Sequence, residues 1–152
     1  MNPSILINET NFLKARNIIR DNRSSKIIFS SDIDELSRKI LEKEKIDVLL
    51  LNQSGRFDQA KQRNSGLNQV LAKIAKKKDV TIGINLDEIL NSNKKKKAEI
   101  LARIRQNINL CKKNNLKMEF VSLNDKNKRR PHDLRALGLV LGMSTSMTKN
   151  LE

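Results

Sequence analysis

The sequence predicts an α/β fold in which five short strands alternate with helices around a parallel sheet. Two observations lead to this prediction. Short apolar runs rich in Ile and Val recur along the chain, and the segments between them switch to the helical spacing of apolar residues. At 152 residues the chain has the size of one domain, and we assign residues 1–152 to that domain. The expected strands are residues 4–8, 26–30, 46–52, 80–86 and 116–123.

Helix signals lie between these strands. Asp32, followed by Glu35 three residues later, has the spacing of a capping box and predicts that a helix begins there. Ser65 and Gly66 precede an apolar stripe of helical period, so the next helix is expected to begin at them. The longest helix is expected at residues 93–114, and the last is expected to begin at Pro131 and to stop at Gly142.

The charge of the chain is large and uneven. The formal net charge is +14, with ten Lys and Arg against nine Asp and Glu in residues 1–60 and 21 against eight in residues 61–152. A surface this basic is typical of nucleic-acid partners. The general lysine richness of a thermophilic or AT-rich proteome is the alternative, but it does not explain the asymmetry. Because no long apolar run is present and Cys111 is the only cysteine, we expect no membrane partner and a cytoplasmic location.

The residues that catalysis needs are scarce. His132 is the only histidine, so neither a cluster of metal ligands nor a nucleophile triad has its usual base, and we expect this side chain to be exposed or to cap a helix. The five glycines match neither the P-loop nor the dinucleotide fingerprint. We therefore expect no catalytic residue, no metal and no cofactor on the chain itself.

The candidate binding residues are cations and one amide, and they lie in two polar stretches, residues 53–64 and 124–130, each of which follows a predicted strand. Side chains of this kind bind phosphates, and with few aromatic residues available recognition is expected to rest on shape and charge. The alternative is that they are ordinary solvated positions. Lys94 to Lys97, at the start of a helix, form either a flexible tether or an RNA contact. The candidates are Arg56, Lys61, Arg63, Asn64, Lys126, Lys128, Arg129 and Arg130.

Four sequence pieces in a fixed order resemble the archaeal ribonuclease P protein component 3 family, over roughly residues 46–143. The first runs from Gly55-Arg56 to Ser65-Gly66-Leu67-Asn68-Gln69-Val70-Leu71-Ala72, and the second is Val80-Thr81-Ile82-Gly83-Ile84-Asn85-Leu86. The third is Ile100-Leu101 to Arg105-Gln106-Asn107 and Leu110. The fourth is Arg129-Arg130-Pro131-His132-Asp133-Leu134, Leu137-Gly138 and Gly142-Met143.

The resemblance implies a TIM-barrel-like fold related to the PHP phosphoesterases but without their metal-ligand histidines. It also implies a subunit of the ribonuclease P endoribonuclease, in which RNA, with Mg²⁺, matures the 5′ end of precursor tRNA. The implied partners are the ribonuclease P RNA, precursor tRNA indirectly, and other protein subunits. Among these is component 2, in a heterodimer or a dimer of heterodimers. Carried over by position, Arg56, Lys61, Arg63, Arg129 and Arg135 are candidates for RNA or partner contact.

One departure from the family concerns length. Family members are usually longer at the N-terminus, and this chain resembles them from about their third barrel strand onward. An N-terminally shortened barrel of five strands is expected to be incomplete, since eight is the usual number. Its two edge strands then need cover from the last helix, from a neighbour or from each other.

Two further functions stay open at this point. One is a degenerate barrel enzyme that acts on a phosphorylated small molecule, with the basic loops binding phosphate. The other is a general RNA-binding or ribosome-associated protein without a role in ribonuclease P.

Overall fold

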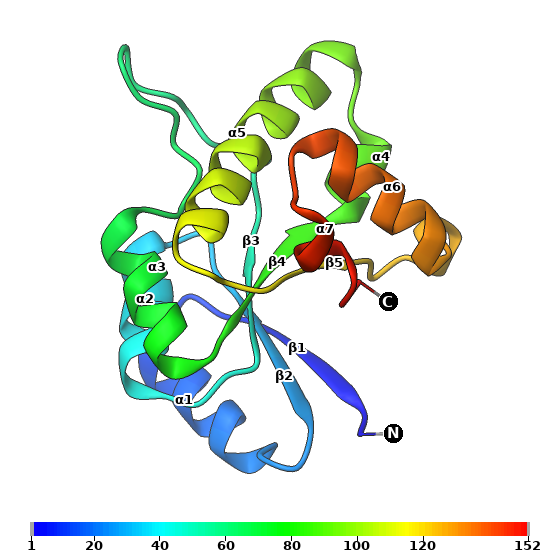
Figure 1. Cartoon of the computed structure of the whole chain (residues 1–152). Coiled ribbons are helices and arrows are strands. Elements are labelled where there is room, and N and C mark those ends of the chain that lie inside the picture. The colour runs from blue at the N-terminus through cyan, green and yellow to red at the C-terminus, as the bar shows by residue number, and fades with distance from the viewer. Residues whose placement is uncertain (1, 152) are drawn as a thin grey trace.

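Five strands and seven α-helices make up residues 2–151, the part of the chain that the computed structural model describes (Figure 1). Each strand lies within a predicted one, and the first two match their predicted bounds. The strands are β1 (Ser4–Asn8), β2 (Lys26–Ser30), β3 (Val48–Leu51), β4 (Thr81–Asn85) and β5 (Met118–Val121). The helices are α1 (Phe12–Asp21), α2 (Asp34–Lys43), α3 (Gln69–Lys78), α4 (Leu86–Asn91), α5 (Lys94–Lys113), α6 (Pro131–Leu141) and α7 (Thr145–Thr148), with a 3₁₀ turn at Asp125–Asn127.

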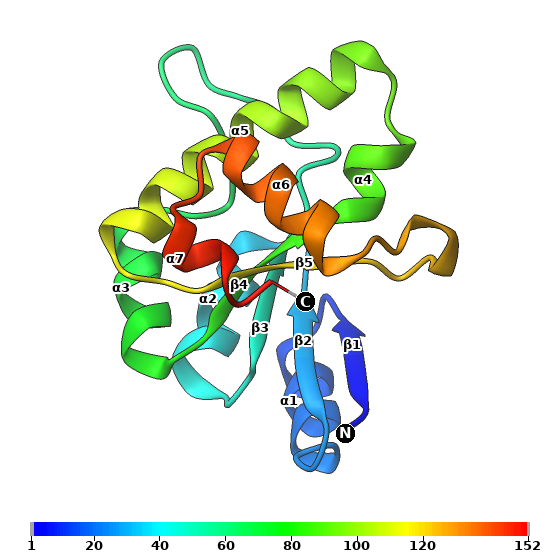
Figure 2. The same ribbon diagram turned by 45° about the vertical axis from the view of Figure 1, so that its right-hand side comes forward.

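The strands are hydrogen-bonded in chain order from β1 to β5, and every pair is parallel. Crossovers between parallel strands are right-handed, so a sheet whose order follows the chain carries its crossover helices on one face. Figures 1 and 2 show α1, α2 and α3 together on one side of a strongly curled sheet. This is the arrangement of a βα barrel with five strands, and the predicted fold class is confirmed.

The two faces of the sheet bury different residues. Leu49 and Ile82 are fully buried on the outer face, where the strands pack against the helices. Ile28, Val48, Leu50 and Val121 form a separate cluster on the inner face. Gly83 also faces this side, and a Cβ atom there would lie 2.9 Å from Cγ1 of Val48. Glycine therefore lets the sheet curl tightly around a narrow interior.

Strands β1 and β5 do not pair with each other in the described residues, so the barrel is open between them. An ion pair nevertheless crosses the interior: Nζ of Lys26 on β2 lies 3.0 and 3.1 Å from the two carboxylate oxygens of Glu119 on β5. A groove of about 490 Å³ lies along the opening and is lined by residues of β1, β2 and β5. The strand edges are thus brought near each other without a hydrogen-bonded closure.

Two predicted helix starts are wrong. The helix expected at Asp32 begins at Asp34 with Ile33 as its N-cap, because Oγ of Ser31 already accepts the N–H of Ile33 in a turn before the helix. The helix expected at Ser65 and Gly66 begins at Gln69 instead. Gly66 has a φ of +79°, which no helix accommodates, and Asn68 is the N-cap.

Other predictions about the helices are confirmed. Helix α5 fills the predicted long segment, with the side chain of Asn93 accepting the N–H of Lys96. Lys94 to Lys97 are consequently helical and do not form a tether. Helix α6 begins at Pro131 and ends at Gly142, whose φ is +111°.

Three further observations concern Cys111, His132 and whether a helix could cross a membrane. Cys111 is buried, and its burial raises the pKa of the thiol to about 12. His132 is exposed in the first turn of α6, as predicted. Among residues 2–151, no helix combines the length and the apolar character needed to cross a membrane.

Candidate nucleic-acid interface

Most of the predicted site residues lie on two loops that leave the carboxyl ends of strands. The β3 loop is residues 52–68, between β3 and α3, and the β5 loop is residues 122–130, between β5 and α6. The two loops point away from opposite sides of the molecule in both Figure 1 and Figure 2. The structure therefore does not bring the two groups of predicted cations into one cluster.

The β3 loop is built around Arg103, a cation of α5 whose side chain is only 4% exposed. Its Nε donates to Oδ1 of Asp58 at 3.0 Å. Its terminal nitrogens donate to the backbone carbonyls of Gln53 and Arg56 at 3.0 and 2.9 Å. The hydrogen bond from Arg103 also holds the pKa of the Asp58 carboxyl below its usual value. Arg103 thus holds the β3 loop in its folded conformation. No pattern in the sequence distinguishes this structural arginine from Arg105, two residues later.

Arg56 is held inside the same loop. Its two terminal nitrogens donate to the two carboxylate oxygens of Asp34, both at 2.9 Å, and its Nε donates to the carbonyl of Asn52. Its side chain is 11% exposed, and Asn64 accepts a further hydrogen bond from it at 3.2 Å. The predicted phosphate contact at Arg56 stays a prediction, but its guanidinium already has protein acceptors.

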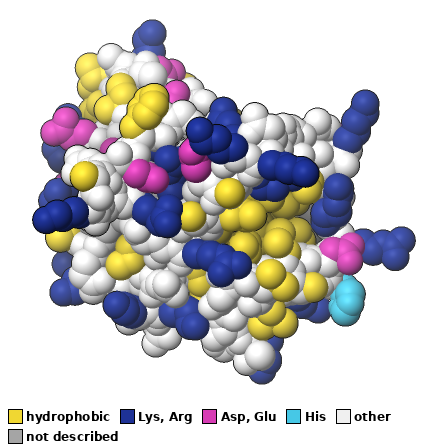
Figure 3. Space-filling model, turned by 90° about the horizontal axis from the view of Figure 1, so that it is seen from above, with side chains coloured by type: hydrophobic (Ala, Val, Ile, Leu, Met, Phe, Trp, Pro, Cys, Tyr) yellow, Lys and Arg dark blue, Asp and Glu magenta, His cyan; other side chains and the backbone are white. Residues whose placement is uncertain are grey.

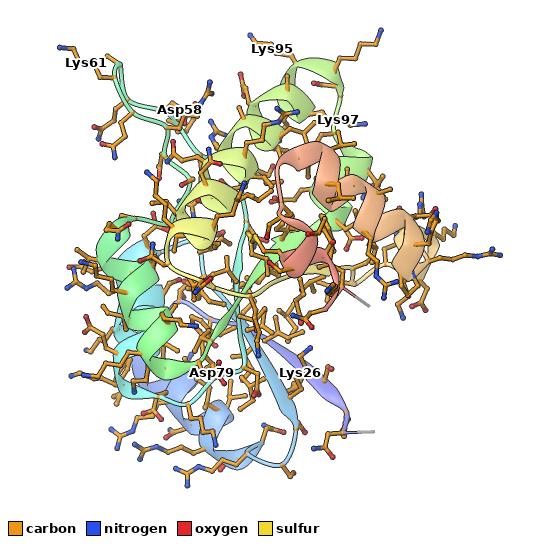
Figure 4. All side chains as sticks on the ribbon, viewed as in Figure 1. Lys26, Asp58, Lys61, Asp79, Lys95 and Lys97 are labelled. Atoms are coloured by element: carbon orange, nitrogen blue, oxygen red, sulfur yellow. The ribbon has the colours of Figure 1, made fainter. Side chains whose placement is uncertain are left out.

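Lys61 and Arg63 are the exposed cations of the β3 loop. Lys61 lies at the tip of the loop and projects away from the body of the protein (Figure 4). The Arg63 side chain is 51% exposed, and its nearest carboxylate oxygen, on Asp58, is 4.0 Å away. Of the four predicted residues of this loop, these two are the ones free to meet a phosphate.

The β5 loop is fastened by Asp87, in the first turn of α4. Its carboxylate accepts hydrogen bonds from the Ser122 hydroxyl, the backbone N–H groups of Leu123 and Asn124, and the Asn127 amide, at 2.8 to 3.3 Å. Partial burial alone raises the pKa of Asp87, but these hydrogen bonds outweigh it and hold the pKa below its usual value.

Glu88, the next residue, fastens the β3 loop in the same way. Its two oxygens accept the backbone N–H groups of Gln53 and Ser54 at 2.8 and 3.0 Å. Asp87 and Glu88 follow the predicted strand at residues 80–86, but their contacts with the loops could not be read from the sequence. Those contacts join residues more than 30 positions apart, which local spacing does not reveal.

The predicted cations of the β5 loop are all exposed. Lys128 pairs with Asp125 at 2.7 Å on the surface, and Arg129 donates to the carbonyls of Lys126 and Lys128 at 3.1 Å. Arg130 is the N-cap of α6, and Arg135 lies one turn into that helix.

A third basic segment lies between the two loops. Lys94 to Lys97 form the first turn of α5, and Figure 4 shows Lys95 and Lys97 at the upper end of the molecule, between the β3 loop and α6. We call the arc formed by the two loops and this turn the basic rim. Its three parts are separate in the sequence, and in space the lysine turn lies between the two loops.

Apolar side chains also reach the surface near the basic rim. Figure 3 shows an apolar patch, bordered by Lys and Arg, on the face seen from above. On α6, Leu139 and Val140 are 48% and 70% exposed. Within residues 2–151, His, Cys, Asp and Glu side chains form no group of three or more suited to a metal ion.

The comparisons with known proteins all find relatives of the same kind. The model of the family described as RNase P subunit p30 matches residues 34–151. The chain is 31% identical over 139 residues to ribonuclease P protein component 3 of Methanosarcina acetivorans, covering 89% of this chain and 55% of that protein. It is 30% identical over 118 residues to the protein of the same description from Methanocaldococcus jannaschii, covering 76% and 48%. The chain thus spans about half the length of the curated relatives it matches.

A solved structure shows the same fold. A chain of the cryo-EM structure of archaeal ribonuclease P with mature tRNA superposes with a TM-score of 0.80 at 23% identity. The match covers 96% of this chain and 62% of that one.

Proposed function

Because the chain belongs to the RNase P subunit p30 family, we propose that it is a protein subunit of ribonuclease P. In this role it binds and stabilises the RNA that performs the 5′ maturation of precursor tRNA. The chain contributes no catalytic group, and the Mg²⁺ that the reaction needs is held by the RNA. The observation that carries the proposal is the basic rim, whose exposed cations lie on loops fastened by Asp87 and Glu88.

The fastening supports binding by shape and charge. Ordering a loop on binding costs free energy, and a loop that is already ordered avoids most of that cost. Cations held at fixed positions can match phosphates of a structured RNA, which proteins recognise mainly through backbone and shape. The exposed Lys61, Arg63 and Arg130 are the residues that we propose to contact phosphates, with Lys126, Lys128, Arg129 and Arg135 around them.

A phosphate-binding enzyme is less well supported. In βα barrels the reacting groups gather where the strands end. Here the side chains at the carboxyl ends of β1, β3 and β4 are Asn8, Asn52 and Asn85, and Ser31 and Ser122 follow β2 and β5. These amides and hydroxyls carry no charge, and Asn52 accepts a hydrogen bond from Asn85 at 2.9 Å. The cations lie on the outer loops instead.

The exposed apolar side chains support a protein partner as well. Leu139 and Val140 are of the kind that interface cores bury, and they lie beside cations that suit RNA. We propose that this surface of α6 binds another ribonuclease P subunit, component 2 being the first choice, in a heterodimer or a dimer of heterodimers. The proposed location is the cytoplasm.

Reconstitution tests this function. The purified chain alone should cut nothing, whereas adding it to the cognate ribonuclease P RNA and the other subunits should raise the rate of precursor tRNA cleavage. Its affinity for the RNA should fall steeply with salt, because each neutralised phosphate releases counterions, by roughly 0.9 in the log–log slope for each contact. If its addition leaves cleavage unchanged, the proposal fails.

A second experiment separates this role from that of a general RNA-binding protein. The protein is purified from its source with its bound RNA, and the RNA is sequenced. Enrichment of ribonuclease P RNA supports the proposed role, and enrichment of ribosomal RNA without it would assign the chain to the general binders.

A further inference from the structure

A second group of cations lies at the other end of the sheet from the basic rim. Helix α3 leads into β4 and α5 leads into β5, so the last turns of both helices lie at the amino ends of these strands. All the lysines there are exposed, and among residues 2–151 none of them takes part in an ion pair. We call this group the amino-end lysine cluster: Lys73, Lys76, Lys77, Lys78, Lys112, Lys113 and Lys117.

The cluster is held on a fixed frame. Gln69 of α3 and Asn114 after α5 exchange two side-chain hydrogen bonds at 3.1 and 3.2 Å. Nζ of Lys76 donates to the carbonyl of Asn115 at 3.0 Å. In Figure 1 the end of α5 lies beside α3. Asp79, which follows α3, and Asn115, which follows α5 by two residues, both have left-handed backbone. The spacing between the two sets of lysines is therefore set by the fold.

Helix dipoles explain only part of this charge. Lysines in a last turn complement the negative end of a helix, which amounts to about half an elementary charge. Two helix ends and the carboxylate of Asp79 therefore supply roughly two negative charges. Seven lysines lie around them, and none of the seven pairs with a carboxylate among residues 2–151, so most of this cationic charge is unpaired in the described chain.

We propose that the amino-end lysine cluster is a second binding surface for the phosphate backbone of structured RNA. The inference rests on the proposed function and extends it: with cations at both ends of the sheet, the chain contacts two separate stretches of RNA. Lysine acts as a flexible point charge that suits phosphates. It is depleted at protein–protein interfaces, which favour aromatic residues, Met and Arg. No large exposed apolar residue lies at 73–79 or 112–117 in the described chain, so an acidic protein is the poorer fit.

The test neutralises three lysines whose side chains take part in no hydrogen bond or ion pair within residues 2–151. The triple variant Lys77→Gln, Lys113→Gln, Lys117→Gln changes the net charge from +14 to +11. The matched control Lys14→Gln, Arg23→Gln, Lys45→Gln makes the same change on the near-neutral part of the protein, also at exposed side chains without ion pairs in residues 2–151. Fluorescence anisotropy of a labelled double-stranded RNA hairpin, titrated with the full chain at several salt concentrations, gives the slope of log affinity against log salt.

The cluster variant should lower that slope by up to about 2.7, roughly 0.9 for each lost contact, whereas the control should keep the slope of the unaltered chain. Equal slopes for both variants would overturn the inference.

A third variant, Lys126→Gln, Arg129→Gln, Arg130→Gln, tests the basic rim in the same assay. If the unaltered chain binds with no salt dependence, or the rim variant changes nothing, the proposed function fails as well, so the two failures are distinguishable. Loss of poly-glutamate binding with an unchanged RNA slope would assign the cluster to an acidic protein instead.

Discussion

Asp87 and Glu88 are neighbours in the first turn of α4, yet their carboxylates bind different loops. Asp87 accepts four hydrogen bonds from the β5 loop, and Glu88 accepts the N–H groups of Gln53 and Ser54 at the start of the β3 loop. One short helix therefore sets the positions of both loops of the basic rim. The carboxylates of Asp87 and Glu88 hold the two loops through backbone N–H groups and uncharged side chains, and they do not pair with the cations of the loops.

Asp87→Ala should release the β5 loop. The substitution leaves two backbone N–H groups and the Asn127 amide without their acceptor, at a cost of about 1–3 kcal/mol in the free energy of unfolding. Hydrogen exchange at residues 122–127 should become faster, and affinity for RNA should fall. Asp133→Ala, at an exposed carboxylate of α6, is the control and should change neither. Unchanged exchange at residues 122–127 would contradict the proposed fastening.

Gly66→Ala should destabilise the protein more than Gly55→Ala does. Both glycines have a left-handed backbone, with φ of +79° and +81°, so both substitutions carry a strain of about 1–2 kcal/mol. Only at Gly66 does the new Cβ meet a neighbour, 2.6 Å from Nη2 of Arg56, while at Gly55 nothing lies within 4 Å. Urea denaturation of the two variants measures the difference. Equal free energies of unfolding would mean that Arg56 is not fixed against this turn.

The stability of the β3 loop should depend on pH through Asp58. Its pKa lies below the ordinary 3.8 in the folded state, chiefly because Arg103 donates to it. A lowered pKa stabilises the fold above the unfolded pKa, and this stabilisation is lost as the pH falls through the folded pKa. Thermal melting should therefore be flat above about pH 5 and should fall below about pH 4. Asp58→Asn should make that fall shallower, and an equally steep fall in the variant would exclude Asp58 as its cause.

The strands could be predicted from the sequence because a buried parallel strand is a local signal. Apolar runs such as Val48-Leu49-Leu50-Leu51 are buried on both faces, so they show in the sequence without knowledge of their neighbours. The start of α3 could not be predicted, because Ser65 is buried by long-range contacts. Its carbonyl accepts from Gln53 and Asn107, and this keeps the chain out of the helix until Asn68.

The candidate site, too, could be predicted only where the signal is local in the sequence. The sequence identified Lys61, Arg63 and Arg130 as exposed cations from the polarity of their surroundings alone. It could not separate them from Arg56, whose partner Asp34 lies 22 residues away in the chain. Ion pairs at such separations leave no periodic pattern, so the distinction between a binding arginine and a structural one required the fold.

Arg56→Gln and Arg63→Gln should therefore differ in kind, although both remove one charge from the same loop. Arg56→Gln removes the two hydrogen bonds to Asp34 and should lower the free energy of unfolding by about 1–2 kcal/mol. Arg63→Gln removes a guanidinium that is 51% exposed, so its stability should stay within about 0.5 kcal/mol of the unaltered chain. Its RNA affinity should fall instead, with a decrease of roughly 0.9 in the salt slope. Urea denaturation and RNA titration of both variants measure the two effects, and an Arg56→Gln protein that keeps its stability but loses one unit of salt slope would make Arg56 a phosphate contact after all.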